Sequence, residues 1–559
     1  MTYQIVPESA PFSNEQRAWL NGFLAGLLGA LDQQTAQGGN STAMAAAATM
    51  LSPSLGAGPN FPPQSQEQFP WHNSSLAITE RMQLAEGKPA ERRLMAAMAQ
   101  LNCGSCGYLC QTYAEAIANG TEKSLTLCSP GGNETAKMVR LIVKESLAND
   151  PKQVNPSGNA NQPNGKASLP IQAAVGTRNN PIEARIIAST NLNQLGSAKD
   201  TRHVAIDLTG TPLRYRVGDA LGIWPTNCDN LICAVLAEAK LDPKTTLTLN
   251  GIDGNKRSVT LSEALRERCL RSVTPELVEI ASQQVRTRPK QNGSLARDAD
   301  ILNELEGFVD SDAVDEWDVL EFLQAFSSVR WPEQEFVDAL APMRPRLYSI
   351  ASSQAKHPTQ VHLTVGRVEN QVRDRERKGV ASTMLADRVE AGSPIRVFVH
   401  PSHGFTIPAD SAAPMIMVGP GTGIAPFIAF LQQREADQAT GKNWLFFGDQ
   451  KRETDFLYRD QLEGWTQNGL LTRLDLAFSR DDASKVYVQH RMQEKGQELF
   501  SWLEGGGHFF VCGDASRMAV DVDKALKEII AVHGGFTEAR TNVYVADLVK
   551  SNRYVRDVY

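Results

Sequence analysis

The chain has 559 residues, which at about 150 residues per domain predicts three to four domains. Lys and Arg number 56 against 63 Asp and Glu, a net charge of −7 without a basic tract, so we expect no binding to nucleic acid. No apolar run approaches the roughly 18 residues of a membrane span and no secretion-signal pattern is present, so we expect a cytoplasmic protein with reduced thiols.

The first 90 residues are predicted to form a helical arm and a linker. Apolar residues spaced as on one helix face occur over 14–31, and Ser13 can serve as the N-cap. Residues 33–69 are rich in Ala, Gly, Ser, Gln and Pro, which is typical of a flexible linker. A helical pattern returns over 75–101 and leads into a group of cysteines.

Four of the eight cysteines lie close together, and we expect them to bind a metal: Cys103, Cys106, Cys110 and Cys128. Where thiols stay reduced, clustered cysteines indicate metal or redox chemistry more often than disulfides. Three thiolates within two helical turns and a distant fourth suit a 4Fe–4S cluster. A structural zinc and a metal-free domain are the alternatives, although zinc sites more often show two separated C-x₂-C pairs.

These cysteines resemble those of the small iron–sulfur domain in Rnf-type and corrinoid iron–sulfur electron carriers. The resemblance rests on Cys103-Gly-Ser-Cys106-Gly, Tyr113-Ala-Glu-Ala-Ile117 and Cys128-Ser-Pro-Gly-Gly132. Three residues separate Cys106 from Cys110, where that family usually has four. The resemblance implies a small helical 4Fe–4S domain, which we place at 91–146.

A second, longer unit follows a linker rich in Asn, Pro, Gln and Gly at 147–180. Alternating apolar and polar residues over 182–224 and 344–400 predict antiparallel strands, and the stretch between them, 228–340, is predicted to be a mainly helical insertion. There the isolated cysteines are expected to be buried packing residues: Cys228, Cys233 and Cys269.

After Pro414 the pattern changes to buried strands that are each followed by a helix. The continuous apolar runs are Met415–Val418, Asn443–Phe447 and His508–Val511. Such runs are typical of parallel strands, so we predict a doubly wound α/β domain at 411–559, after an antiparallel domain at 181–410.

Two strings are predicted to bind a flavin. In Arg346-Leu-Tyr348-Ser349 the arginine offers a fork to a pyrophosphate, and the tyrosine points to the same face of the strand. By itself this string also fits an ordinary surface strand. The glycine-led helix start Lys378-Gly-Val-Ala-Ser382-Thr383 favours the flavin, because its N–H groups can hold a pyrophosphate.

A third string is predicted to bind a nicotinamide dinucleotide. Gly419-Pro-Gly-Thr-Gly423 lies between a buried strand and a helix, so its N–H groups can hold a pyrophosphate. Two cations and two hydroxyls downstream suit a 2′-phosphate and favour NADPH over NADH: Ser479, Arg480, Lys485 and Tyr487. The alternative is a solvated charged loop.

Residues 181–559 resemble the ferredoxin–NADP⁺ reductase-like half of the diflavin reductases, which include the flavoprotein subunit of NADPH-dependent sulfite reductase. The matching strings are Tyr215–Asn227, Arg346–Ser353, Thr364–Gly366, Val418–Pro426, Asn443–Gly448, Ser479-Arg480, Lys485–Gln489, Val511–Asp514 and Arg556–Tyr559. The family begins with an FMN-binding flavodoxin domain. No flavodoxin phosphate loop occurs in residues 1–180, so we expect the iron–sulfur cluster to replace FMN as the one-electron outlet.

The resemblance also implies residue roles. Around the transferred hydride it places Ser349, Cys512, Asp557 and Tyr559, with the Tyr559 ring stacked on the flavin. FAD contacts are implied at Arg346, Leu347, Tyr348, Ser349, Thr364, Val365, Gly366, Gly379, Val380, Ala381, Ser382 and Tyr559. NADPH contacts are implied at Gly419, Gly421, Thr422, Gly423, Ser479, Arg480, Lys485, Tyr487, Gln489 and Asp521.

The function implied is an NADPH-dependent reductase that passes electrons through FAD and the cluster to an acceptor protein. The resemblance favours a sirohaem sulfite reductase as acceptor. A nitrite reductase or a ferredoxin is an alternative acceptor. A flavin-binding scaffold or regulatory subunit without turnover is the non-enzymatic alternative.

Overall fold

The computed structural model describes residues 69–71, 76–100, 108, 110–120, 122, 125–128, 131–149, 175–251, 255–288, 294–309, 316–373, 375–402 and 404–559. The chain divides after Gln68, and all described residues belong to the second part, Phe69–Tyr559. The expected helix at 14–31, nearly all of the linker at 33–69 and most of the linker at 147–180 lie outside the described residues.

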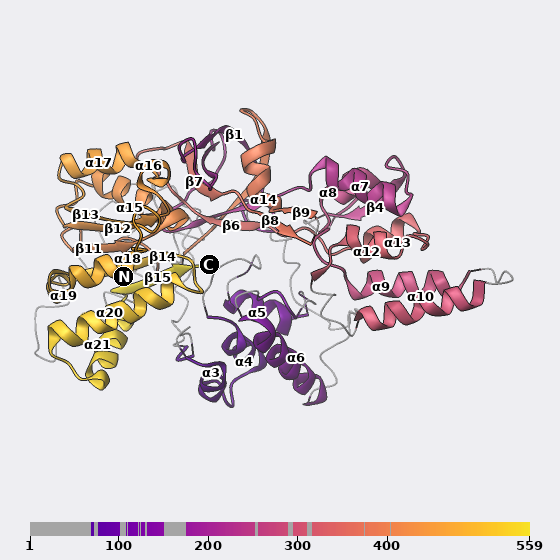
Figure 1. Ribbon diagram of the computed structural model, residues 1–559, viewed down its shortest axis with the longest axis horizontal. Coiled ribbons are helices and arrows are strands. Elements are labelled where there is room, and N and C mark those ends of the chain that lie inside the picture. The colour runs from indigo at the N-terminus through magenta and orange to yellow at the C-terminus, as the bar shows by residue number, and fades with distance from the viewer. Residues whose placement is uncertain are drawn as a thin grey trace, which may run out of the picture. The chain divides into compact units, whose positions relative to one another are not determined.

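A small helical module carries the cysteine region (Figure 1). Its helices are α3 (Ile78–Leu84), α4 (Ala90–Ala97), α5 (Cys110–Ala118) and α6 (Gly132–Asn149). The helical pattern predicted over 75–101 is thus two helices rather than one, because Gly87 adopts φ +71° and Pro89 occupies the N-cap of α4. Its buried core includes Leu94, Tyr113, Val139 and Ile142.

An antiparallel sheet follows, as the alternating pattern predicted. Its strands are β1 (Ile182–Asn191), β2 (Thr201–Asp207), β3 (Ala220–Trp224), β6 (Arg346–Ser349), β7 (Gln360–Gly366) and β10 (Pro394–His400). The order is β6-β3-β10-β1-β2-β7, and every neighbouring pair is antiparallel. A bridge between Ile350 and Leu363 links the two edges of the sheet. The inward residues alternate along β2, where Val204 and Ile206 are buried in one core with Val361 and Leu363 of β7.

The segment between β3 and β6 is mainly helical, as predicted. It comprises α7 (Asp229–Ala239), α8 (Leu261–Arg266), α9 (Pro275–Arg286), α10 (Ser294–Val309), α12 (Val319–Ala325) and α13 (Glu333–Ala339). It also contains a hairpin that was not predicted, β4 (Thr246–Asn250) with β5 (Lys256–Thr260). The insertion buries an apolar core of its own between Ile232 and Leu340. The three cysteines expected to be buried here are not: Cys228 and Cys269 are half-buried and Cys233 is exposed.

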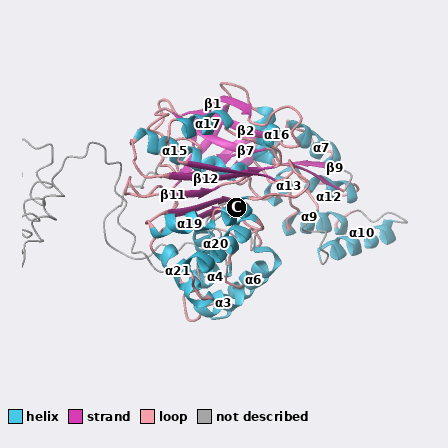
Figure 2. Cartoon of the chain, turned by 60° about the vertical axis from the view of Figure 1, so that its left-hand side comes forward, coloured by secondary structure: helices cyan, strands magenta, loops and turns pink. Residues whose placement is uncertain are grey.

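The last part contains a parallel sheet with helices on both faces (Figure 2). Its strands, in the order β13-β12-β11-β14-β15, are β11 (Met415–Val418), β12 (Asn443–Asp449), β13 (Arg473–Phe478), β14 (His508–Gly513) and β15 (Tyr554–Val558). The helices are α15 (Ala425–Ala436), α16 (Arg452–Asp455), α17 (Arg459–Gln467), α18 (Val488–Glu494), α19 (Gly496–Glu504), α20 (Met518–Gly534) and α21 (Glu538–Lys550).

Alternate residues of the parallel strands enter two different cores. In β11, Ile416 and Val418 pack with the core that includes Leu526, whereas Met415 and Met417 pack with the core that includes Phe430. This explains why the strands are apolar throughout, and it confirms the doubly wound prediction. Among the described helices, none is long and apolar enough to cross a membrane.

Candidate functional site

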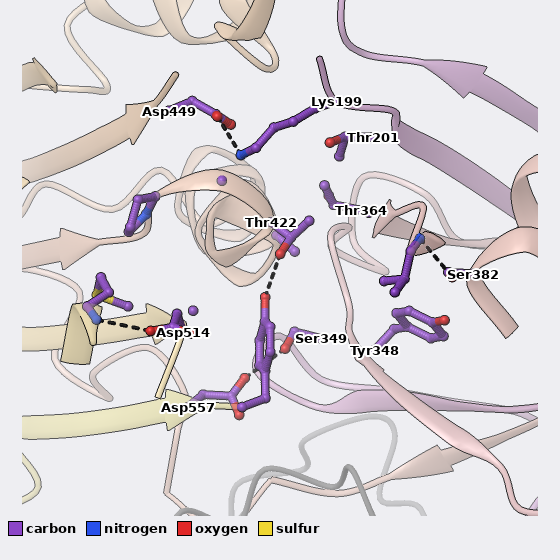
Figure 3. Close-up of a pocket in the computed structure, with 18 of the residues that line it drawn as sticks. Lys199, Thr201, Tyr348, Ser349, Thr364, Ser382, Thr422, Asp449, Asp514 and Asp557 are labelled. Atoms are coloured by element: carbon purple, nitrogen blue, oxygen red, sulfur yellow. Dashed lines mark hydrogen bonds and ion pairs between the residues drawn. The ribbon is translucent and has the colours of Figure 1, made fainter. Parts of the chain in front are cut away.

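A cleft of about 1790 Å³ runs between the antiparallel sheet and the carboxyl ends of the parallel strands (Figure 3). Short elements border it: the hairpin β8 (Glu369–Val372) with β9 (Arg375–Lys378), α14 (Val380–Thr383) and the 3₁₀ turn Gly421–Ile424. Single-ligand pockets usually measure about 300–1,000 Å³, so this cleft has room for two dinucleotides. The carboxyl edge of a parallel sheet is where such folds bind their ligands.

Three predicted catalytic side chains meet where the antiparallel and parallel sheets face each other. The Ser349 hydroxyl donates a hydrogen bond of 2.7 Å to Asp557 Oδ2. The Cys512 thiol, 3.9 Å from the same oxygen, comes from β14, where Cys512 pairs directly with Asp557 of β15. Cys512 is fully buried behind the carboxylate and does not itself line the cleft. The structure therefore brings the three together, with Asp557 as the shared acceptor.

Burial governs the protonation of this group. It raises the pKa of the Cys512 thiol well above its ordinary value, and the neighbouring Asp557 charge raises it further. Burial also raises the pKa of Asp557, against the hydrogen bonds from Ser349 and Cys512. Cys512 is therefore a neutral thiol near pH 7, suited to packing behind Asp557 rather than to nucleophilic attack.

Tyr559 stands over the same part of the cleft. Its hydroxyl is 2.9 Å from Thr422 Oγ1, and its side chain remains partly exposed. The backbone is fixed by hydrogen bonds of 3.0 Å from Tyr559 N to Gly513 O and from Ala515 N to Tyr559 O. The Tyr559 side chain thus reaches the glycine turn, while its backbone stays joined to the end of β14.

The predicted flavin residues line the opposite wall, with one exception. Those in the cleft are Arg346, Leu347, Tyr348, Ser349, Thr364, Gly366, Gly379, Val380, Ala381 and Ser382. Val365 instead points into the core of the antiparallel sheet and is fully buried. An ideal Cβ on Gly379 would lie 2.6 Å from Ser382 Oγ, so the close turn before α14 requires glycine. Ser382 Oγ accepts a hydrogen bond of 3.1 Å from Val368 N.

The glycines of the predicted phosphate turn divide into two kinds. Gly421, with φ +57°, and Thr422 face the cleft. Gly419 and Gly423 do not line it, and each is required for packing. An ideal Cβ on Gly423 would lie 2.1 Å from Cys512 O, and one on Gly419 would lie 2.5 Å from Gly423 O. Gly423 therefore lets the turn lie directly against the end of β14, and Gly419 lets the turn close on itself.

The four predicted 2′-phosphate residues are divided between the cleft and its surroundings. Ser479 and Tyr487 line the cleft, as do Gln489 and Asp521, two further predicted NADPH contacts. Gln489 Nε2 donates a hydrogen bond of 3.2 Å to Asp521. Arg480 and Lys485 are exposed on the loop between Ser479 and Tyr487 and do not line the cleft.

Several cleft residues were not predicted: Lys199, Arg271, Asp449, Asp514 and Arg517. Lys199 lies on the connection from β1 to β2, and Asp449 is the last residue of β12. Asp449 follows a predicted buried strand, so its place at the carboxyl edge was a usable signal. Nothing in the sequence pattern around Lys199 separates it from other loop lysines.

Two of the four predicted metal ligands belong to the described residues. Cys110 is buried at the start of α5, and Cys128 is half-buried and accepts a hydrogen bond of 3.4 Å from Ala99 N. An ideal Cβ on Gly131 would lie 3.0 Å from Cys128 Sγ, so glycine leaves space beside this thiol. Cys103 and Cys106 lie outside the described residues, and within those residues no group of three or more metal-ligating side chains occurs.

A buried cation lies close to both thiols. Burial lowers the pKa of Arg81, and the negative charge of Cys110 and Cys128 in their thiolate forms opposes that shift. An adjacent guanidinium stabilises thiolates, which are the form that binds a metal. Both described cysteines therefore fit the ligand chemistry of an iron–sulfur or zinc centre.

The helical module contacts the segment that leads into β6, the strand of the flavin wall that begins at Arg346. Arg344, two residues before β6, forms an ion pair of 3.3 Å with Glu122, and Glu122 accepts a hydrogen bond of 3.3 Å from Tyr108 Oη. The Arg178 guanidinium lies 3.9 Å from the centroid of the Tyr108 ring. Tyr108 stacks on Tyr113 of α5, the helix that begins at Cys110.

Three family models match the chain. The FAD binding domain matches residues 176–384, the oxidoreductase NAD-binding domain matches 417–524, and the Fe-S cluster model matches 98–130. The chain therefore carries FAD-binding and nicotinamide-binding oxidoreductase domains, as predicted, and the stretch that matches the Fe-S cluster model contains all four predicted ligands.

Curated relatives match the greater part of the chain. The sulfite reductase NADPH flavoprotein alpha-component of Bacillus subtilis is 41% identical over 71% of this chain and 66% of that relative. The alpha-component of Mannheimia succiniciproducens is 42% identical over 69% and 63%. That of Klebsiella pneumoniae is 36% identical over 81% of this chain and 72% of the relative. This chain thus spans slightly less than two thirds of the first two.

Proposed function

This chain belongs to the family of sulfite reductase NADPH flavoprotein alpha-components, and we propose that it is an NADPH-dependent oxidoreductase. In this proposal electrons pass from NADPH through FAD and a 4Fe–4S cluster to an acceptor protein. Bound FAD would supply the conversion of a two-electron donor into single electrons. The residues of the chain bind and orient the two dinucleotides and exclude water between them.

One observation carries the proposal. Ser349 of the flavin wall and Asp557 of the parallel sheet are hydrogen-bonded at the point where the two halves of the cleft meet. A flavin along the Arg346–Ser349 strand and a nicotinamide entering past Thr422 would therefore come together at this pair. Asp557 can steady positive charge that develops on a nicotinamide, and Ser349 can orient the flavin ring.

For the cysteine module we propose a 4Fe–4S cluster held by Cys103, Cys106, Cys110 and Cys128. The Fe-S cluster match over 98–130 and the buried Arg81 beside two of the thiols support this. The four thiolates require a reducing compartment, which supports a cytoplasmic location. The acceptor proposed is a sirohaem sulfite reductase, since the relatives carry the sulfite reductase name.

We further propose that the functional units are the cluster domain at 91–146, the FAD domain at 181–410 with its insertion at 228–340, and the NADP domain at 411–559. The bridge from Ile350 to Leu363 supports closure of the antiparallel sheet into a barrel. The 2′-phosphate of NADPH is assigned to Ser479, Arg480, Lys485 and Tyr487.

The experiment that tests the function uses the chain purified without oxygen. Addition of NADPH is expected to bleach the flavin and then to produce the electron paramagnetic resonance signal of one reduced cluster. Iron and sulfide analysis is expected to give one 4Fe–4S centre per chain. A zinc content, or a flavin that NADPH cannot reduce, would overturn the proposal. Reduction of added sulfite reductase, compared with nitrite reductase and ferredoxin, identifies the acceptor.

The 2′-phosphate assignment has a separate test. Arg480→Ala with Lys485→Ala is expected to raise the KM for NADPH about 10- to 100-fold and to change the KM for NADH little, because only NADPH carries the dianion. Lys524→Ala, on the exposed face of α20, is the control. Equal losses for both dinucleotides would contradict the assignment.

A further inference from the structure

Lys199 and Asp449 form an ion pair across the cleft. Lys199 belongs to the connection from β1 to β2, on the flavin side, and Asp449 ends β12 of the parallel sheet. The distance from Lys199 Nζ to Asp449 Oδ1 is 2.5 Å (Figure 3). The carboxylate is fully buried, whereas the lysine side chain is 36% exposed. Such a buried charge is retained only where it is paired and hydrogen-bonded.

Only one of the two carboxylate oxygens of Asp449 has hydrogen-bond partners among the described residues. Its Oδ1 also accepts a hydrogen bond of 2.7 Å from Gln450 N. Its Oδ2 is buried and, among the described residues, has no hydrogen-bond partner. A buried acceptor that lacks a donor is unfavourable, and a ligand hydroxyl or amide would relieve that cost.

The Lys199 ammonium and the Asp449 Oδ2 atom both lie close to the glycine turn. An ideal Cβ built on Gly421 would lie 3.7 Å from Lys199 Nζ and 3.8 Å from Asp449 Oδ2. A side chain at this position would cover both atoms, so glycine leaves the ion pair uncovered on the side of the turn. Lys199, Asp449, Gly421 and Thr422 all line the cleft, and together they offer a cation, an acceptor without a donor and a glycine turn.

We propose that the Lys199–Asp449 pair holds the central part of the nicotinamide dinucleotide. Lys199 Nζ pairs with the pyrophosphate, and Asp449 Oδ2 accepts a hydrogen bond from a ribose hydroxyl beside it. This rests on the proposed use of a nicotinamide dinucleotide. Asp449 keeps the ammonium directed at the turn while the ligand is absent. NADPH and NADH share the pyrophosphate and the ribose, so the pair sets affinity for both and does not discriminate between them.

The test compares Lys199→Gln with the unmodified chain. Binding of NADP⁺ and NAD⁺ is measured by calorimetry, and KM and kcat are measured with NADPH and NADH. Lys199→Gln is expected to weaken both dinucleotides about tenfold or more, because a charge-assisted contact to phosphate is lost. The kcat is expected to stay within about twofold. Inhibition by inorganic pyrophosphate is expected to weaken in parallel.

Two further variants sharpen the result. Asp449→Asn keeps the shape of the side chain but releases the ammonium. In a double-mutant cycle, Lys199→Gln with Asp449→Asn is expected to lose less binding free energy than the sum of the two single losses, because both single changes remove the same Lys199–Asp449 pairing. The control is Lys356→Gln, which removes a lysine paired at 2.9 Å with Glu435 of α15, also between the flavin side and the parallel sheet but outside the cleft. This control is expected to bind both dinucleotides normally.

Three outcomes would overturn the inference. Unchanged binding in Lys199→Gln would leave the pair a purely structural contact. A loss confined to NADPH would place Lys199 at the 2′-phosphate, and a loss of bound FAD would place it at the flavin pyrophosphate. If the unmodified chain bound neither dinucleotide, the proposed function would fail instead, so the two failures are distinguishable.

Discussion

Ser349 and Asp557 are 208 positions apart in the sequence, and their side chains share a hydrogen bond of 2.7 Å. One residue ends β6 of the antiparallel sheet and the other lies in β15 of the parallel sheet. The bond fixes the orientation of the serine hydroxyl and ties the two sheets together inside the cleft. The Cys512 thiol contacts the same carboxylate oxygen, so Asp557 orders both neighbours.

Removing the Asp557 charge is therefore expected to slow flavin reduction. Asp557→Asn keeps the shape of the side chain but loses the carboxylate that orders Ser349 and steadies charge on the nicotinamide. We expect the rate of flavin bleaching by NADPH in anaerobic stopped flow to fall roughly 100-fold, with unchanged FAD content. Asp547→Asn, on the exposed face of α21, serves as the control. An unaltered rate would mean that Asp557 only joins the domains.

Gly423→Ala is expected to damage the same site through sterics alone. Its new Cβ would lie 2.1 Å from Cys512 O, so the end of β14 has to move, at a cost of about 1–3 kcal/mol in stability. We expect a lower thermal midpoint and slower flavin reduction. Gly464→Ala makes the matched comparison, because Gly464 is exposed in α17 with no heavy atom within 4 Å of the added Cβ. That variant is expected to be neutral or slightly more stable.

Reversing the charge of Arg344 or Glu122 is expected to loosen the helical module. Arg344→Glu breaks the ion pair between the helical module and the segment before β6, so limited proteolysis of the module is expected to become faster, and reduction of the cluster by the flavin slower, than in the unmodified chain. The double exchange, Arg344→Glu with Glu122→Arg, is expected to restore both measurements. Arg373→Glu, at a more exposed pair with Glu316, is the control. No recovery in the double exchange would argue against a specific contact.

Three packed histidines are expected to make the protein sensitive to acid. The His362 ring lies 4.8 Å from that of His203 and 4.3 Å from that of His357, measured between centroids. Burial, followed by the charges of the other two histidines, lowers the pKa of His362 to about 3, against about 6.5 in an unfolded chain. The folded state thus favours the neutral ring. The contribution of the neutral His362 ring to the free energy of unfolding is complete above pH 6.5, and it declines as the pH falls from there toward 3.

His362→Gln is accordingly expected to flatten the fall in the thermal midpoint between about pH 6.5 and pH 5. His533→Gln, which replaces an exposed histidine near the end of α20, is expected to leave that fall unchanged. An identical pH dependence in the two variants would show that the acid sensitivity arises elsewhere.

The sequence predicted the sheets well, because their apolar pattern is set by which faces are buried. The apolar run of β11 identified a parallel strand, and the alternation in β2 identified an antiparallel one. The hairpin β4–β5 was missed inside a region dominated by helical spacing. The helix predicted over 75–101 was too long, since the left-handed Gly87 and the Pro89 N-cap of α4 divide it.

The candidate site was predictable where a local motif carries it. The glycine turn and the Arg346–Ser349 string each contain their own signal, although which glycines face the cleft depends on contacts with β14. Lys199 has no such signal, because its role depends on a partner 250 positions away. The surroundings of Cys512 likewise depend on the register of β14 with β15.

The placement of the helical insertion bears on the order in which the chain folds. β3 and β6 are neighbours in the sheet, yet residues 225–345 separate them, and closing so long a loop costs entropy before any pairing is gained. The two ends of the insertion bind the same segment: Asn227 Nδ2 bonds the carbonyls of Leu265 and Arg268, and Met343 N bonds that of Glu267. An insertion that forms early from its local contacts would deliver β6 beside β3, acting as a folding template for the flavin strand.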